Sequence, residues 1–317
     1  MNRVLVVGAG AVGQVYGRHL ARGGAAVTFL VKPAHAAELA GGLTLYPLNR
    51  PRRQRAQPVR FTDFQSLTDV SAAAAERWDQ VYLTVSSTAL RAGDWFARLA
   101  AGLGPATLVL LQPGPGDRRF VEERVPAAQI VQGVITVISY RAPMPGETRF
   151  PEPGVAYWFG PLAKSPLSGP RSDAVVAALR AGGLPARRNP ELAKSSTFPT
   201  AMFMPLLAVL EKAGWKFGVV REPARLALAA RAGDEALQVM ARHQGQKAPL
   251  ALRLLNHPLA VRLVLAVAPR LMPFDLERYL QVHFTKVGDQ TRDFLRTYLA
   301  LGRDAGLPTE ALAQLTD

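Results

Sequence analysis

The stretch VLVVGAGAVGQVYGRHLARGGAAVTFLVKP, residues 4–33, sets the expected fold. A strand-like apolar run leads into Gly8, Gly10 and Gly13, and a helical stretch and a second strand-like run follow. In this context the G-x-G-x-x-G spacing is typical of a dinucleotide-binding turn. Gly8 allows the tight turn, Gly10 lets the backbone approach a pyrophosphate, and Gly13 lets helix and strand pack closely.

The phosphates of the dinucleotide are expected at the amino end of that helix, beside Ala11 and Val12, where unpaired N–H groups favour negative charge. A site for NAD usually places Asp or Glu about 20 residues along to bind the ribose 2′-hydroxyl, yet the first acidic residue here is Glu38. Lys32 ends the second strand, and Arg3, Arg18 and Arg22 lie in the same stretch. A cation at Lys32 favours NADP over NAD, and a solvent-facing strand end is the alternative interpretation.

Composition narrows the class of protein. The 317 residues suffice for two domains. The longest apolar run, residues 263–268, is too short to span a bilayer, and no signal peptide is apparent, so we expect a cytoplasmic protein. Without cysteine, and with five histidines lacking ligand spacing, a metal site is not expected.

The net charge of +14 could attract phosphate groups, nucleic acid or an anionic membrane. The dense basic run at 49–60 has no interleaved aromatics for base stacking. We interpret it as a solvated connection between strands, with contact to a ligand or partner as the alternative. We expect neither a nucleic-acid nor a membrane partner. The sequence leaves open whether the protein forms a homodimer.

The order of apolar runs predicts an α/β architecture. Expected strands are residues 3–9, 25–31, 42–48, 57–61, 80–85, 106–112 and 130–140, followed by a hairpin on the same sheet, a helix at 172–183 and a strand at 186–189. Residues 1–189 would form an N-terminal Rossmann domain and residues 190–317 an all-helical domain. In the latter, Pro199 and Pro205 are expected to kink or interrupt the first helix, and one last helix is expected from Asp275, its N-cap, to Gly306.

Several motifs follow one another in the order found in a known family. They are the glycine turn, Lys32, VYLTVSS at 81–87, LLQPGPG at 110–116, NPELAKSS at 189–196, PLLAVLEKAG at 205–214 and LGRDAGLPTEAL at 301–312. With this order the chain resembles the ketopantoate reductases (2-dehydropantoate 2-reductases) over almost its whole length. The resemblance implies a Rossmann domain that binds NADPH, a helical domain that closes over it, and reduction of a 2-keto acid.

The residues at the family's functional positions differ here. By the resemblance, Ser196 stands where the family has its proton-donating lysine, and Gln290 stands where it has its substrate-binding glutamate. Arg278 replaces a serine near that glutamate, and Ser86 replaces a lysine. Pro113 replaces the asparagine that precedes Gly114 beside the nicotinamide. The resemblance therefore implies that ketopantoate is a poor substrate or none. Arg278 and Lys286 suggest an anionic carbonyl substrate that is larger or more apolar than ketopantoate.

The last helix carries polar groups on an otherwise apolar face. At helical spacing this face holds Leu276, Leu280, His283, Val287, Gln290 and Phe294, with Lys286 at its border. Buried polar groups need partners, so His283 and Gln290 either bond to another helix or line a cleft. Lys286 or His283 is a candidate proton donor for an alkoxide.

Ser195 and Ser196 could hold a carbonyl, or serve as hydrogen-bonding residues at a helix start. The alternative to an enzyme is a regulatory or interaction module that binds NADP without catalysis.

Overall fold

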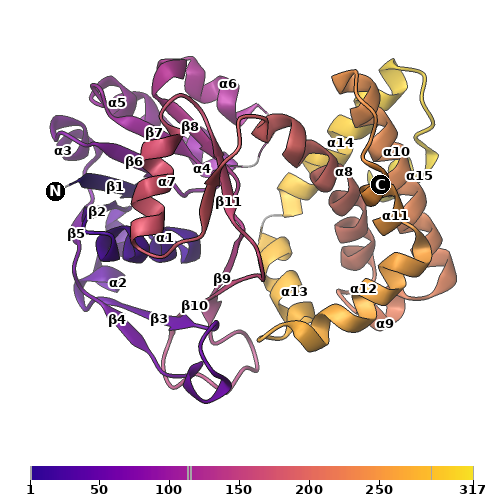
Figure 1. Cartoon of the computed structure of the whole chain (residues 1–317), viewed down its shortest axis with the longest axis horizontal. Helices are drawn as coiled ribbons and strands as arrows, with labels where there is room; N and C mark the ends of the chain where they lie inside the picture. The colour runs from indigo at the N-terminus through magenta and orange to yellow at the C-terminus, as the bar shows by residue number, and fades with distance from the viewer. Residues whose placement is uncertain (1, 113, 115, 287, 317) are drawn as a thin grey trace. The chain divides into compact units, whose positions relative to one another are not determined.

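The computed structural model describes residues 2–112, 114, 116–286 and 288–316, without the side chains of Ala193 and Lys194. The chain forms two compact units, which we call unit 1 (residues 1–192) and unit 2 (residues 193–317). Unit 1 combines strands and helices, and the described part of unit 2 is helical (Figure 1). The predicted α/β class with a helical C-terminal part is confirmed.

The larger sheet of unit 1 has the arrangement of a dinucleotide-binding fold. Across the sheet the strands are β12 (Ala186–Arg188), β11 (Ser165–Ser168), β8 (Ile130–Gly133), β7 (Thr107–Leu110), β6 (Gln80–Leu83), β1 (Arg3–Val7), β2 (Ala26–Leu30) and β5 (Gln65–Leu67). Neighbouring strands are parallel except β8 and β11. Val4, Leu5 and Val6 are fully buried, as expected for a strand covered on both faces.

A second sheet differs from the prediction. Its strands, in spatial order, are β4 (Val59–Phe61), β3 (Leu43–Pro47), β10 (Gly154–Phe159) and β9 (Val137–Ala142). The sequence predicted these segments as part of one sheet, and predicted a single strand over 130–140 where the structure has β8 and β9. The second sheet forms because Leu45, Val155 and Tyr157 share a buried core with the helix that follows β1, so this sheet covers that helix.

Helices cover both faces of the larger sheet. They are α1 (Ala11–Arg22), α2 (Ala36–Ala40), α3 (Val70–Ala75), α4 (Ser87–Arg91), α5 (Trp95–Ala101), α6 (Asp117–Glu122) and α7 (Ser172–Ala181), with 3₁₀ turns η1 (Pro33–His35), η2 (Arg52–Gln54) and η3 (Ala127–Gln129). Side chains of α1 and α7 belong to one apolar core, and those of α3 and α5 to another. The basic run at 49–60 connects β3 to β4, with Arg52 and Arg53 exposed, as predicted for a solvated connection.

Unit 2 contains eight described helices. They are α8 (Leu192–Lys212), α9 (Phe217–Val220), α10 (Pro223–Gln244), α11 (Leu250–Leu255), α12 (Pro258–Leu271), α13 (Leu276–Lys286), α14 (Gly288–Asp304) and α15 (Glu310–Thr316). α8 runs through Pro199 and Pro205 rather than being interrupted. None of the described helices is both long enough and apolar enough to cross a membrane.

The predicted last helix is described as two helices on either side of residue 287. The amide of Arg278 donates to Asp275 Oδ1 at 3.0 Å, which confirms Asp275 as the cap of α13. Gly306, at φ +64°, follows α14 and ends it as predicted.

His19 holds α1 against the rest of unit 1. Its Nδ1 lies 2.8 Å from the carbonyl oxygen of Gly182, directly after α7, and its ring meets Tyr157 and Phe159 of β10 edge-on. The side chain is almost completely buried. Burial, with a smaller contribution from Arg18, lowers the pKa of His19 from 6.5 to about 4.

His19 should make unit 1 less stable in mild acid. Between pH 6.5 and about 4 the unfolded chain binds a proton at His19 that the folded chain does not bind, so stability falls as the pH falls through this window. At pH 5 the loss should be about 2 kcal/mol, from about 1.4 kcal/mol per pH unit. Urea unfolding at pH 7 and pH 5 should show a smaller loss for His19→Gln than for the unmodified protein, and equal losses would contradict the assignment.

Candidate functional site

The candidate site lies where the strand order of the larger sheet reverses. β1 is flanked by β2 on one side and by β6 on the other, and the chain continues outward from both. Ligands of open α/β sheets bind at such a switch point, beside the carboxyl ends of the strands. Residues 8–13 follow β1 and residues 84–86 follow β6, so these segments meet at the expected position.

Two glycines of the turn are required by packing. Gly8 adopts φ +96°, and its N–H donates to the carbonyl of Leu30 at 2.9 Å. A Cβ on Gly13 would lie 2.1 Å from the carbonyl oxygen of Gly8 and 2.7 Å from Thr84 Oγ1. A side chain at Gly13 would therefore push α1 away from β1 and β6.

Gly10 is different, because nothing inside the protein requires it. Its backbone is extended, with φ −69°, and no atom lies within 4 Å of a Cβ placed there. Gly10 is also the N-cap of α1 and supplies no capping side chain, and the first turn of α1 has no acidic residue. The backbone around Ala11 and Val12 is thus suited to an anion.

The loop after β6 is tied to its neighbours by side chains. Thr84 Oγ1 donates to the carbonyls of Val7 and Gly8, both at 2.9 Å. Ser86 Oγ accepts from the amide of Ala89 at 3.2 Å and so caps α4. In the loop after β7, Gln112 Nε2 donates to the carbonyl of Val85 at 2.8 Å. Ser86, which was predicted as a coenzyme contact, is the N-cap of α4.

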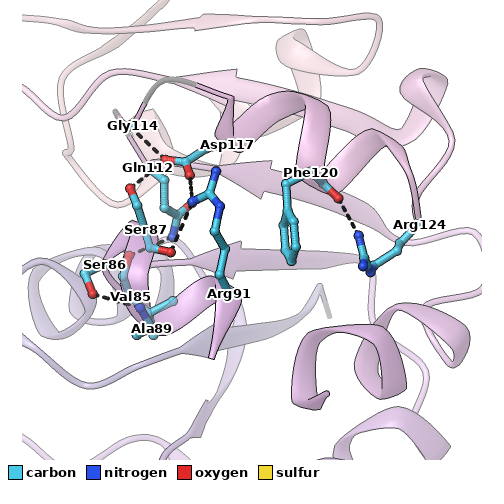
Figure 2. A network of polar contacts seen from close by, with 10 residues as sticks. All are labelled: Val85, Ser86, Ser87, Ala89, Arg91, Gln112, Gly114, Asp117, Phe120 and Arg124. Carbon is cyan, nitrogen blue, oxygen red and sulfur yellow. Dashed lines mark hydrogen bonds and ion pairs between the residues drawn. The ribbon is translucent and has the colours of Figure 1, made fainter. Parts of the chain in front are cut away.

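A buried carboxylate, Asp117, connects Gly114 to α4. Figure 2 shows the hydrogen bonds to its two carboxylate oxygens. Oδ2 accepts from Ser87 Oγ at 2.6 Å and from the amide of Gly114 at 2.8 Å, and Oδ1 accepts from Arg91. Gly114 must be glycine here, because a Cβ would lie 2.5 Å from Ser87 Oγ. Gly114, predicted as a coenzyme contact, follows β7, which is the neighbour of β6 in the sheet, and its predicted neighbour Pro113 is outside the described residues.

Arg91 is held by more than its carboxylate partner. Its Nη1 also donates to the carbonyl of Ser87 at 3.2 Å, and its guanidinium lies 5.2 Å from the centre of the Phe120 ring. Sequence reasoning missed Asp117, although an acidic residue directly after GPG and at the start of a helix was a usable signal.

The end of β2 is cationic. Lys32 is exposed two residues after the strand. Glu38 is already engaged, with His35 Nδ1 and Arg141 Nη2 each 3.0 Å from its carboxylate, and these two contacts lower the pKa of Glu38. Arg3 lies at the opposite end of β1 and pairs with Glu76, so it does not add to this charge.

All five of the predicted catalytic and substrate residues lie among the described residues of unit 2. His283 stacks on Tyr279 and meets Phe284 edge-on, and burial together with Lys286 lowers its pKa. Lys286 is exposed, one turn further along α13. Ser196 lies in the first turns of α8, where its carbonyl accepts from the hydroxyl of Thr200 at 2.9 Å.

The predicted common face of the last helix is corrected for α14. Gln290 is only half-buried, and the buried side of α14 instead carries Thr291, Leu295 and Tyr298, one position further along. Val287, which belongs to the same predicted face, lies outside the described residues. Arg278 is partly neutralised by Asp275, 3.8 Å away.

The sheet order and the glycine turn define a fold of the dinucleotide-binding class. A family model for ketopantoate reductase PanE/ApbA matches residues 4–164, and the chain belongs to this family. No curated protein matches the sequence.

Solved structures share the fold over nearly the whole chain. A PanE/ApbA family ketopantoate reductase from Ralstonia eutropha JMP134 is 19% identical, with TM-score 0.71, over 99% of this chain and 96% of its own. A 2-dehydropantoate 2-reductase from Geobacter metallireducens GS-15 is 19% identical, with TM-score 0.73, over 99% and 97%. A D-mandelate dehydrogenase in a ternary structure with NADH and anilino(oxo)acetate is 15% identical, with TM-score 0.70, over 99% and 96%.

Removing Arg91 should strongly destabilise unit 1. Arg91→Ala leaves the carboxylate of Asp117, whose side chain is 2% exposed, without its charged partner, at a cost of about 3 kcal/mol. Adding Asp117→Asn should recover part of this loss, because the neutral amide no longer needs a cation. Urea unfolding measures both. Arg98→Ala, which breaks an exposed pair with Asp94, is the control and should cost less than about 1 kcal/mol.

Proposed function

We propose that the protein is an oxidoreductase that uses NADPH in preference to NADH and reduces the carbonyl of an anionic 2-keto acid other than ketopantoate. The observation that carries the proposal is the turn at Gly8–Gly13, with an open position at Gly10, at the switch point of the sheet. Membership in the ketopantoate reductase family supports the reaction class.

The turn fits the pyrophosphate of a dinucleotide. Gly10 leaves room for close approach, and the first amides of α1, at Ala11, Val12 and Gly13, would donate to phosphate oxygens. Ser86 and Gly114, in the loops after β6 and β7, would border the coenzyme on the other side. When bound, the nicotinamide supplies the hydride.

Alanine at Gly10 and alanine at Gly13 should act differently. Gly10→Ala should leave the unfolding midpoint nearly unchanged, because its methyl group meets no protein atom. It should nevertheless weaken NADPH binding at least tenfold, because the methyl occupies the space for the pyrophosphate. Gly13→Ala should lower stability by several kcal/mol through the contact with Gly8. Fluorescence titration and thermal unfolding test this, and undiminished binding by Gly10→Ala would contradict the site.

Lys32 supports the preference for NADPH. A 2′-phosphate needs a cation near the end of β2, whereas the 2′-hydroxyl of NAD needs a carboxylate there. Lys32 is exposed at this end, and the nearest acid in the sequence, Glu38, is engaged by His35 and Arg141. The two D-mandelate dehydrogenase structures of similar fold hold NADH, so the fold itself does not fix the coenzyme.

Lys32→Ala should weaken NADPH binding about tenfold, or about 1.4 kcal/mol, and leave NADH binding unchanged, because only NADPH presents the 2′-phosphate. Titration with both coenzymes measures the ratio. Lys164→Ala, at another exposed lysine of unit 1, is the control. Equal effects on both coenzymes would contradict the role of Lys32.

The substrate proposal rests on residues in unit 2. By the family resemblance, Ser196 and Gln290 replace a lysine and a glutamate needed for ketopantoate, and Arg278 and Gln290 would contact the substrate. Lys286 is an exposed cation without an ion pair among the described residues, and we assign it as proton donor. His283 is less suited to this role, because burial disfavours its charged form.

A panel of 2-keto acids that includes ketopantoate tests the reaction through oxidation of NADPH. Lys286→Ala should lower kcat at least a hundredfold, in the range of a general acid, and leave NADPH binding intact. His283→Ala should instead lower stability by about 1 kcal/mol, through lost ring contacts with Tyr279 and Phe284. Rapid turnover of ketopantoate, or full activity of Lys286→Ala, would overturn the assignment. Coenzyme binding without turnover of any carbonyl would favour a non-catalytic NADP-binding module.

A further inference from the structure

Exposed apolar side chains are concentrated in one short part of unit 2. Ten large apolar side chains in the described chain are strongly exposed, and eight of them lie in α11 and α12: Leu250, Leu254, Leu255, Leu259, Leu263, Val264, Val267 and Leu271. We call these eight residues the α11–α12 surface. Contiguous apolar exposure of this kind marks an interaction site, whereas single exposed apolar residues need no explanation.

The α12 helix is apolar on two sides. Val261 and Leu265 pack into unit 2, and Leu259, Leu263 and Val267, spaced four residues apart, follow the side that faces away from this core. Leu259 and Leu263 are 70% and 63% exposed. A helix with apolar residues on two opposite sides is normally covered on both, so the outer side of α12 indicates a partner.

The α11–α12 surface is presented by a well-held segment. Asn256, between the two helices, is buried and donates to the carbonyl of Ala230 at 2.7 Å and to Asp234 Oδ1 at 3.0 Å on α10. Gly233 makes room for it, because a Cβ there would lie 2.3 Å from Asn256 Oδ1. His257 caps α12 by accepting from the amide of Leu259 at 3.3 Å. The exposed leucines are therefore fixed by their helix and are not part of a frayed end.

The charge around this surface has one sign. Residues 236–274 contain no Asp or Glu, and their five cations are all exposed: Arg242, Lys247, Arg253, Arg262 and Arg270. The first three line a hollow of about 740 Å³ between α10 and α11, with Leu250 at its wall. The acidic group in that lining, Asp234, is already bonded to Asn256.

The positive charge around the α11–α12 surface favours an anionic partner over a second copy of the chain. A second copy docked by two-fold symmetry would bring the cations of both chains to the same interface, where they would repel. A bilayer with anionic lipids offers an apolar acyl region for the leucines and, next to it, phosphate groups for the cations. We propose that the α11–α12 surface binds the surface of an anionic lipid bilayer, with α12 lying in the interface plane.

The expectation of no membrane partner rested on the absence of a long apolar run and on the make-up of the basic run at 49–60. Whether a short apolar run is exposed depends on the tertiary structure, and the runs in α11 and α12 are exposed. The α11–α12 surface is independent of the proposed reaction, because it involves neither the glycine turn nor Lys286.

Co-sedimentation of the full chain with vesicles tests the proposal. The protein should bind vesicles of phosphatidylcholine mixed with phosphatidylglycerol, should not bind phosphatidylcholine alone, and should lose binding as salt rises. Leu263→Asp should abolish binding. Leu162→Asp, which changes the charge equally at an exposed position of unit 1, should not. Arg262→Ala with Arg270→Ala keeps the leucines and should weaken binding about fivefold per cation.

Thermal unfolding and NADPH titration of each variant confirm that the fold and the coenzyme site are intact. Absence of vesicle binding by the unmodified protein overturns the proposal, as does equal binding by Leu263→Asp. A dimer in sedimentation velocity that Leu263→Asp dissociates, without vesicle binding, would assign the surface to a second copy. Binding that needs phosphatidylglycerol and Leu263 together supports the bilayer.

Discussion

The packing of Gly13 against the carbonyl of Gly8 is the contact on which the rest of unit 1 depends. With no Cβ at this point, α1 begins directly against the ends of β1 and β6. Gly17 repeats the arrangement one turn later, since a Cβ there would lie 2.5 Å from the ring of Phe29 on β2. At the far end of the helix, His19 meets the residues after α7 and the rings of β10. The position of α1 in turn sets where its amino end meets a ligand and where the second sheet can form.

The carboxylate of Asp117 is a second buried contact of unit 1, separate from the glycine turn. One buried side chain accepts from a hydroxyl and a guanidinium of α4, on Ser87 and Arg91, and from the amide of Gly114. Such a group stabilises only while all its partners are present, because an unpaired buried charge is costly. Asp117 therefore ties Gly114 to α4.

In unit 2, apolar helix residues form the interior in one helix and an exposed surface in another. Apolar residues of α10, such as Leu237 and Val239, form its interior, and the similar residues of α12 lie partly outside. Hydrophobicity alone does not separate the two sets. Exposure separates them, and the absence of acidic residues over 236–274 gives the exposed set its electrostatic character.

Local sequence signals determined much of this protein. The spacing of Gly8, Gly10 and Gly13 and the cap at Asp275 act within a few residues, so the parallel sheet, the glycine turn and the start of α13 could be predicted. Only the tertiary structure decided that β3, β4, β9 and β10 leave the main sheet, that Asp117 joins Arg91, and that α14 buries Thr291 rather than Gln290. These features depend on contacts between residues far apart in the chain, and a pattern read along the sequence carries no information about which of several apolar faces meets another.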